Sequence, residues 1–196
     1  MSRVTCDLTI SLDGFLAGPN QTQTDPLGEG GELLHRWQFE EPESNAAELE
    51  GILAAGAYIM GRNMFAGPGT WDEEWRGWWG EEPPYHAPVF VLTHHPREPL
   101  EMQGGTTFNF VNDGIESALA QARNAAGSKD VAIAGGAQTA RQYLSAGLID
   151  ELRLHTAPIV LGAGERLFDG VANLKLEPTE VRGTRLVTHV HYRVIR

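Results

Sequence analysis

The sequence has only one cysteine, Cys6, so an internal disulfide is excluded. A free cysteine inside an apolar run is typical of a reducing compartment, and we expect the cytoplasm. No run of 18 or more apolar residues is present, and the stretch MSRVTCDLTISLDG lacks the apolar core of a signal peptide. We therefore expect neither export by such a signal nor a membrane span.

Basic residues are also few. The chain has 15 Lys and Arg against 26 Asp and Glu, and its formal net charge is −11. Because nucleic acids need a positive surface, this balance argues against a nucleic acid as the principal partner. Any phosphate must be held by local groups, and Arg62 and the stretch THHPR (93–97) are the candidates.

Length and composition are those of one globular domain, which we expect to span residues 1–196. Apolar residues make up 41% of the chain, and there is no internal repeat, low-complexity tract or linker. A folded chain of this size buries roughly 70% of the surface that it exposes when unfolded, so a core needs no disulfide or metal.

Apolar and β-branched segments predict strands, in chain order 3–11, 57–61, 88–96, 106–111, 130–134, 149–162 and a hairpin over 174–196. Helical spacing predicts helices over 45–55, after Asp113 and over 138–146, with a helical turn at 62–65 and Gly147 ending the 138–146 helix. Asn45 with Glu48, and Asp113 with Glu116, have the capping-box spacing.

Three segments read as loops. LDGFLAGPN (12–20) follows the first strand, residues 21–31 are polar and rich in glycine, and residues 71–88 carry Trp71, Trp75, Trp78 and Trp79 without helical or strand period. The tryptophan loop either forms a lid over a flat heterocycle, caps the core or makes a dimer contact.

Strands alternating with helices before a terminal hairpin predict an α/β fold: a three-layer αβα sandwich with a mostly parallel sheet and an antiparallel carboxyl-terminal edge. Ligands of such sheets bind beyond the carboxyl ends of the strands. Three of these ends, at Gly61–Arg62, Thr93–Arg97 and Gly135–Gln138, carry unusual residues that should converge.

Glycines at 135 and 136 stand between a strand and a helix. Such a pair lets the backbone approach a pyrophosphate closely, while the helix amino terminus favours negative charge. The alternative is that glycine only supplies a positive φ in a tight turn. Arg62 also follows a strand directly and could bind phosphate oxygens, or be a surface arginine.

Basic residues follow a third strand. His94, His95 and Arg97 stand where the adenosine end of a dinucleotide could lie, and a 2′-phosphate there would favour NADPH over NADH. The alternative is a solvated turn. The joint pattern of the three strand ends favours a dinucleotide site.

The chain resembles the dihydrofolate reductase superfamily. The resemblance rests on ordered motifs that cover most of the sequence, SLDGFLAG, IMGRNMF, VFVLTHHP, AIAGGAQTARQYL and IDELRLHTAPIVLGAGERLF. SLDG, DEL and PIVLGAGERLF are most similar to the branch that contains the carboxyl-terminal reductase domain of the bifunctional riboflavin biosynthesis enzyme.

This resemblance implies bound NADPH and hydride transfer to a C=N or C=O bond of a small heterocycle, as in 5-amino-6-(5-phosphoribosylamino)uracil reductase. The segment 15–18 matches the mobile loop that closes over the nicotinamide. The implied cofactor-binding residues are Leu16, Ala17, Gly61, Arg62, Asn63, Met64, Thr93, His94, Arg97, Gly135, Gly136, Ala137, Gln138 and Thr139.

A catalytic acid is harder to assign. True dihydrofolate reductases carry a carboxylate on their first helix, and that slot falls near Asn45, which cannot ionise. Glu48 could substitute, or serve only as a capping-box partner. Asp13 could orient substrate or relay a proton, or be a turn aspartate that bonds its own backbone.

Other features point in several directions. His189 and His191 share one face of a strand without a nearby third ligand, so we expect a solvated face and no metal. The apolar carboxyl terminus is compatible with a two-fold homodimer. Besides a reductase, the sequence leaves open a true dihydrofolate reductase and a non-catalytic dinucleotide-binding protein.

Overall fold

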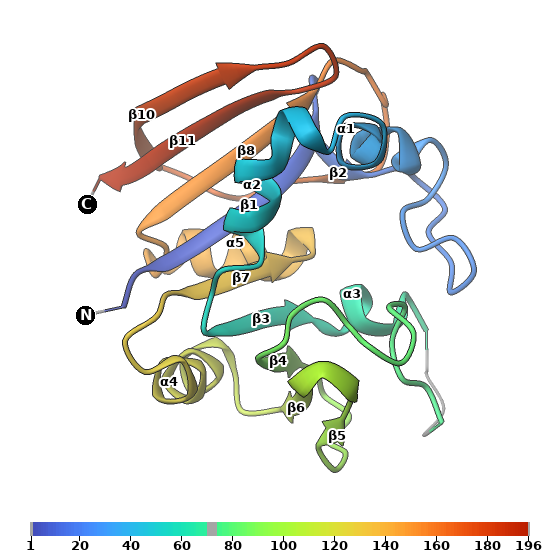
Figure 1. Cartoon of the computed structure of the whole chain (residues 1–196), viewed down its shortest axis with the longest axis vertical. Helices are drawn as coiled ribbons and strands as arrows, with labels where there is room; N and C mark the ends of the chain where they lie inside the picture. Colours follow the sequence, from blue (N-terminus) through green and yellow to red (C-terminus); the bar gives the residue numbers. More distant parts are fainter. Residues whose placement is uncertain (1, 70–73, 196) are drawn as a thin grey trace.

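The computed structural model describes residues 2–69 and 74–195, and it alternates strands with helices (Figure 1). The strands are β1 (Val4–Ser11), β2 (Phe15–Ala17), β3 (Ala57–Gly61), β4 (Pro88–Leu92), β5 (Leu100–Glu101), β6 (Thr107–Val111), β7 (Val131–Gly135), β8 (Glu151–Ala157), β9 (Glu165–Arg166), β10 (Lys175–Gly183) and β11 (Thr188–Ile195). The helices are α1 (Arg36–Glu40), α2 (Ala46–Ile52), α3 (Arg62–Ala66), α4 (Ile115–Ala126) and α5 (Ala137–Ser145), with 3-10 turns η1 (Gly31–His35), η2 (Glu43–Asn45) and η3 (Gln103–Gly105).

A nine-stranded sheet in the described part of the chain has the order β10-β11-β8-β1-β7-β3-β4-β6-β5. The strands from β8 to β6 in this order run parallel, while β11 pairs antiparallel with β8 and with β10. The predicted mostly parallel sheet with an antiparallel carboxyl-terminal hairpin is confirmed. Among the described helices, none is both long and apolar enough to cross a bilayer.

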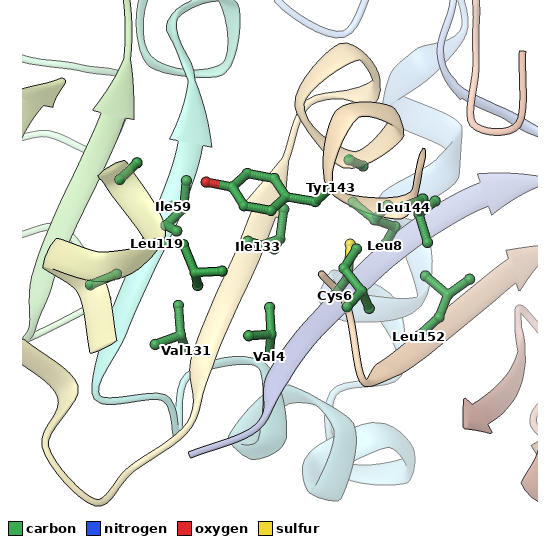
Figure 2. Close-up of a cluster of buried hydrophobic side chains, with 14 of the residues drawn as sticks. Val4, Cys6, Leu8, Ile59, Leu119, Val131, Ile133, Tyr143, Leu144 and Leu152 are labelled. Carbon is green, nitrogen blue, oxygen red and sulfur yellow. The ribbon is translucent and has the colours of Figure 1, made fainter. Parts of the chain in front are cut away.

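One face of the sheet carries the main hydrophobic core. Side chains of a strand point alternately to opposite faces, and on β1 Val4, Cys6 and Leu8 share one face and are buried. Figure 2 shows these side chains together with Leu119 of α4 and Tyr143 of α5. The helices α4 and α5 therefore form the layer on this side of the sheet.

The opposite face of the sheet has two parts. A second hydrophobic cluster, with Phe65 of α3 and Phe108 of β6 as its central rings 5.0 Å apart, lies over β3, β4 and β6. Over β1, β8 and β11 the covering layer comes from η1, α1 and α2, and α2 lies in front of these strands in Figure 1. Here the buried residues include polar ones, such as Thr9, His155 and His189.

Both predicted capping boxes are wrong. The helix α2 begins at Ala46 as expected but ends at Ile52, and the Asn45 side chain makes no cap hydrogen bond. The helix α4 follows Gly114, and the Asp113 carboxylate instead accepts a hydrogen bond from the Ser117 hydroxyl at 2.8 Å. The stretch predicted as a loop after β1 also contains a strand, because β2 pairs with β9.

Gly61 packs closely against α5. A Cβ at this position would collide with the Thr139 hydroxyl, so that side chain would have to shift. We predict that Gly61→Ala lowers the free energy of unfolding by about 1–3 kcal/mol and that adding Thr139→Ala restores part of it. Chemical denaturation measures both effects.

Gly183→Ala is the matched control for this substitution. The nearest atoms to a Cβ at Gly183 would lie 3.9 Å away, which is ordinary contact, so stability should stay unchanged. Equal losses for Gly61→Ala with and without the Thr139 substitution would contradict the packing explanation.

Candidate functional site

A cleft of about 970 Å³ runs across the sheet at the carboxyl ends of the parallel strands. Gly61 and Gly135 mark the ends of β3 and β7, and Leu92 and Val111 mark the ends of β4 and β6. The cleft also reaches β1 and β8, so it crosses most of the parallel part of the sheet. This is the edge at which open α/β sheets bind ligands.

The structure brings nearly all residues implied for the cofactor into this cleft. Its lining includes Leu16, Ala17, Gly61, Arg62, Asn63, Met64, Thr93, His94, Gly135, Gly136, Ala137, Gln138 and Thr139. The three strand ends singled out in the sequence therefore converge. The exception among these residues is Arg97.

The two glycines at the end of β7 differ in their surroundings. Gly135 has φ +123°, and a Cβ there would contact the Met64 sulfur at 3.4 Å, so this glycine serves the backbone conformation. Gly136 follows through a cis peptide bond, lines the cleft, and has no atom within 4 Å of its ideal Cβ position. The bend thus presents bare backbone to open space.

The helix α5 begins directly after this bend. Its first intrahelical bond runs from the Ala140 N–H to the Gly136 carbonyl, and Ala137, Gln138 and Thr139 form the turn before it. The N–H groups of a first turn have no partner within the helix, and they make its amino terminus attractive to anions. Because these residues line the cleft, their main-chain donors lie beside it.

Basic side chains flank the same part of the cleft. The Arg62 guanidinium donates to the Asn63 side chain at 3.2 Å and to the Gly67 carbonyl at 3.3 Å, which fixes it at the start of α3. The Thr93 hydroxyl accepts the His95 N–H at 3.0 Å and shapes the turn that carries His94 and His95. Both imidazoles are exposed and line the cleft.

Arg97 lies outside the lining of the cleft, unlike the histidines before it. Its guanidinium donates to the Trp75 carbonyl at 2.9 Å and stands over the Phe110 ring, 5.0 Å from the ring centroid. Arg97 therefore anchors the tryptophan loop, and only His94 and His95 remain as basic groups from this turn in the cleft.

The described tryptophans of that loop pack on α3 and on the core. Trp75 and Trp78 donate their indole N–H groups to the Phe65 and Met64 carbonyls at 2.8 and 2.9 Å. Trp79 stacks on Phe108, with the ring centroids 5.8 Å apart. Trp78 and Trp79 also form part of the cleft wall, whereas Trp71 lies outside the described residues.

At β1 and β8 the cleft ends in a polar pocket that sequence reasoning missed. Asp7, Thr9, His35, Gln38 and His155 line it, from β1, η1, α1 and β8. Asp7 and Thr9 lie on the face of β1 opposite the core, and Thr9 pairs in register with His155. The period-two alternation of polar residues in CDLTIS was the available signal.

The expected solvated face at His189 is wrong, because His189 and His155 are each only 1% exposed. Their Nδ1 atoms lie 2.7 Å apart, and His189 Nε2 lies 2.9 Å from the Asn45 side-chain oxygen. The Trp37 ring packs against both imidazoles, at centroid distances of 5.1 and 5.2 Å. Burial, with repulsion from His155, lowers the pKa of His189 to about 4.

The two carboxylates considered for catalysis both lie outside the cleft lining. Asp13 accepts hydrogen bonds from the Ser11 hydroxyl and from the Leu161 and Gly162 N–H groups, and these bonds lower its pKa to about 2. At neutral pH Asp13 is therefore a carboxylate that joins two loops, and it holds no proton to relay.

Glu48 forms an ion pair with Arg182 of β10. Burial acts to raise its pKa, but the hydrogen bonds from Arg182 outweigh burial, and the pKa is lowered. Within residues 2–69 and 74–195, no group of three or more His, Cys, Asp or Glu side chains could hold a metal ion.

Comparisons with known proteins agree with this geometry. The family model described as the RibD C-terminal domain matches residues 2–190. The Bacillus subtilis protein YyaP is 26% identical over 197 residues, which cover 97% of this chain and 94% of that protein. The fold is similar to that of a putative riboflavin biosynthesis protein from Shewanella sp. PV-4, with a TM-score of 0.68, 23% identity and full coverage of both chains.

A longer structure is similar over part of its length. The diaminohydroxyphosphoribosylaminopyrimidine deaminase/5-amino-6-(5-phosphoribosylamino)uracil reductase of Thermotoga maritima matches with a TM-score of 0.61 and 16% identity. The match covers 99% of this chain and 57% of that one. The expected three-layer fold of the dihydrofolate reductase type is confirmed by these structural neighbours.

The buried histidine pair predicts a loss of stability in mild acid. The pKa of His189 is about 4 in the folded chain against an ordinary 6.5, so the unfolded chain binds the proton first as the pH falls. The free energy of unfolding should therefore decrease between about pH 6.5 and pH 4, by up to about 3 kcal/mol. Urea denaturation at several pH values measures this slope.

Substitution of His189 isolates its share of the slope. His189→Gln should flatten the pH dependence in this window, whereas His191→Gln, on the same strand, should keep it. Identical slopes for the wild type and His189→Gln would contradict the assignment to His189.

Proposed function

Because this chain belongs to the RibD C-terminal domain family, we propose that it is an NADPH-dependent reductase of a small, pyrimidine-like heterocycle. The observation that carries the proposal is the single cleft along the carboxyl edge of the sheet, with an anion-favouring end and a polar, side-chain-lined end. In this proposal a hydride passes to a C=N or C=O bond of the substrate.

The anion-favouring end suits the pyrophosphate of a dinucleotide. Gly136 leaves room for close approach to the backbone, α5 offers the N–H groups of its first turn, and Arg62 adds a cation. His94 and His95 stand further along the cleft, where protonation would let them favour a 2′-phosphate. The residues present therefore fit NADPH, whose reduced nicotinamide would supply the hydride.

The polar end suits a flat heterocycle with several hydrogen-bonding atoms. Asp7 accepts hydrogen bonds, the Gln38 amide both donates and accepts, and His35 and His155 can do either. Leu16 lines the cleft as well and provides apolar contact. Pyrimidines carry amino, imino and carbonyl groups on one plane, which matches this mixture.

A true dihydrofolate reductase is less well supported. Its first-helix carboxylate would correspond to Asn45 or Glu48, and both are buried at α2, outside the cleft lining. Glu48 is held by Arg182, and the Asn45 amide is bonded to main-chain carbonyls and to His189.

The proposed cofactor end predicts a specific loss of affinity. NADPH should quench the fluorescence of Trp78 and Trp79, which lie in the cleft wall, and Arg62→Gln should raise the Kd for NADPH by about 10- to 100-fold, because a charge-assisted hydrogen bond is lost. Fluorescence titration measures the Kd.

Arg123 supplies the control for charge, because it lies exposed on α4. Arg123→Gln removes the same positive charge from the chain and should leave the Kd unchanged. Equal effects of the two substitutions would mean that Arg62 acts only through the net charge.

The substrate end predicts the outcome of an activity screen. With NADPH present, 5-amino-6-(5-phosphoribosylamino)uracil and related aminopyrimidines should cause loss of nicotinamide absorbance, whereas dihydrofolate should not. NADH in place of NADPH tests the contribution of His94 and His95. Tight NADPH binding without turnover of any heterocycle would instead favour a non-catalytic dinucleotide-binding protein.

A further inference from the structure

A chain of hydrogen bonds leads from the covering layer of the sheet into the cleft. It runs from the Asn45 amide oxygen to His189 Nε2 at 2.9 Å, and from His189 Nδ1 to His155 Nδ1 at 2.7 Å. The two histidines stand directly opposite each other on β11 and β8, which are neighbours in Figure 1. The far side of His155, its Nε2 atom, is the end of the chain.

Asn45 fixes the direction of this chain. Its amide nitrogen lies 2.8 Å from the Glu41 carbonyl and 3.2 Å from the Trp37 carbonyl, so it must donate to both. The reversed amide would place its oxygen against two other oxygens. The Asn45 oxygen therefore accepts, and His189 Nε2 must carry a hydrogen.

The short Nδ1–Nδ1 contact then determines the state of His155. Only one hydrogen can lie between the two Nδ1 atoms. When both rings are neutral, His189 already holds its hydrogen on Nε2, so the shared hydrogen belongs to His155 Nδ1. His155 Nε2 is then a bare lone pair.

Adding one proton to the histidine pair changes only the His155 Nε2 end of this hydrogen-bonded chain. If the charge rests on His155, its Nε2 gains the hydrogen directly. If the shared hydrogen shifts and the charge rests on His189, His155 again carries its hydrogen on Nε2. In both arrangements the pair takes up and gives back one proton through His155 Nε2. The hydrogen bonds between the two rings and to Asn45 are kept.

This nitrogen is buried and without a hydrogen-bond partner in the described part of the chain. Its nearest carboxylate oxygen, on Asp7, lies 3.8 Å away, beyond hydrogen-bond distance. His155 is 1% exposed and lines the polar end of the cleft. Because an unsatisfied buried polar atom is costly, this geometry indicates a position where a ligand atom bonds.

We propose that His155 is the catalytic acid of the reaction, with Nε2–H as the proton donor and His189 as the positioning residue behind it. The inference rests on the proposed reductase function. As a hydride from the reduced dinucleotide bonds to the substrate carbon, the π electrons of the C=N or C=O bond move to the heteroatom. That atom takes the proton from His155 Nε2, which becomes neutral, and water later restores the proton.

Charged and titratable groups surround the pair on every side. Asp7 of β1 lies 3.8 Å from His155 Nε2, and Arg153 lies 3.6 Å from Asp7. Glu48 of α2 lies 3.9 Å from His189 and favours a charge shifted there, against its partner Arg182 of β10. His35 of η1 faces His155, and burial together with His155 lowers its pKa. The carboxylate of Glu48 thus acts against burial, but burial wins and lowers the pKa of His189.

The state of the rings can be measured without any activity. Long-range ¹⁵N–¹H correlation spectra of the wild-type protein should show His189 with hydrogen on Nε2 and neutral His155 with hydrogen on Nδ1. Titration to lower pH should add the hydrogen to His155 Nε2. A neutral His155 with hydrogen on Nε2 would overturn the inference.

Substitution tests the chemistry. His155→Asn and His155→Gln should each lower kcat by about 100-fold or more, because a general acid contributes on this scale, while the Kd for NADPH stays at the wild-type value. Because burial lowers the pKa of His189, the pair loses its proton in acid, so the wild-type kcat should fall as the pH rises through the acid range. This limb should vanish in both variants. Asp7→Asn should move the limb to lower pH.

His191→Asn is the matched control, since His191 lies two residues from His189 on β11, is partly exposed, and faces Glu180 at 3.3 Å. It should keep both kcat and the pH limb. A His155 variant with wild-type kcat and an unchanged pH limb would overturn the proposal. If the wild type binds NADPH but reduces no heterocycle, the reductase function fails instead, and the spectra alone decide the state of His155.

Discussion

Side chains alternate between the two faces of β1, β8 and β11, and both faces of these strands are covered. A strand buried on both faces usually reads as a continuous apolar run. On β1 only the face toward α4 and α5 follows this rule, with Val4, Cys6 and Leu8, while Asp7 and Thr9 occupy the other face. Polar groups buried in this way must find partners, and that requirement organises the layer of η1, α1 and α2.

Trp37 and Asn45 meet that requirement from outside the sheet. The Trp37 ring packs against both imidazoles and donates its indole N–H to the Thr9 hydroxyl at 3.3 Å. Asn45 joins the main chain of the covering layer to His189 through three hydrogen bonds. Asn45, where the resemblance to dihydrofolate reductases suggests a carboxylate, is thus an amide that holds a buried histidine in place.

The sequence predicted the features that depend only on neighbouring residues, such as the ends of strands. The strand ends at Gly61, Thr93 and Gly135 were found because glycine, threonine and arginine after an apolar run mark a turn wherever the strand lies in the sheet. The fold followed from the order of these elements. The resemblance implied a cofactor role for Gly61, but its close packing against the Thr139 side chain of α5 could not be predicted from the sequence.

Interactions between distant segments could not be predicted in the same way. Glu48 has capping-box spacing, yet its partner Arg182 lies 134 residues further along the chain. The Arg97 guanidinium donates a hydrogen bond to the Trp75 carbonyl. The Asp13 carboxylate accepts one from the Gly162 N–H, in the loop after β8. His155 and His189 meet only because β8 and β11 pair in one register, and a shift by one residue would have turned His189 to the other face. The register of a strand depends on the whole sheet, so a short stretch of sequence cannot predict it.

The two ends of the cleft therefore differ in how strongly their structure depends on particular side chains. The anion-favouring end is built from main-chain donors and a bare glycine, which many sequences can supply once the fold is formed. The polar end is built from side chains whose placement depends on the register of β1, β8 and β11. In the proposed reductase, substrate choice would therefore depend on β1, β8 and the layer above them, and cofactor choice on the turns after β3, β4 and β7.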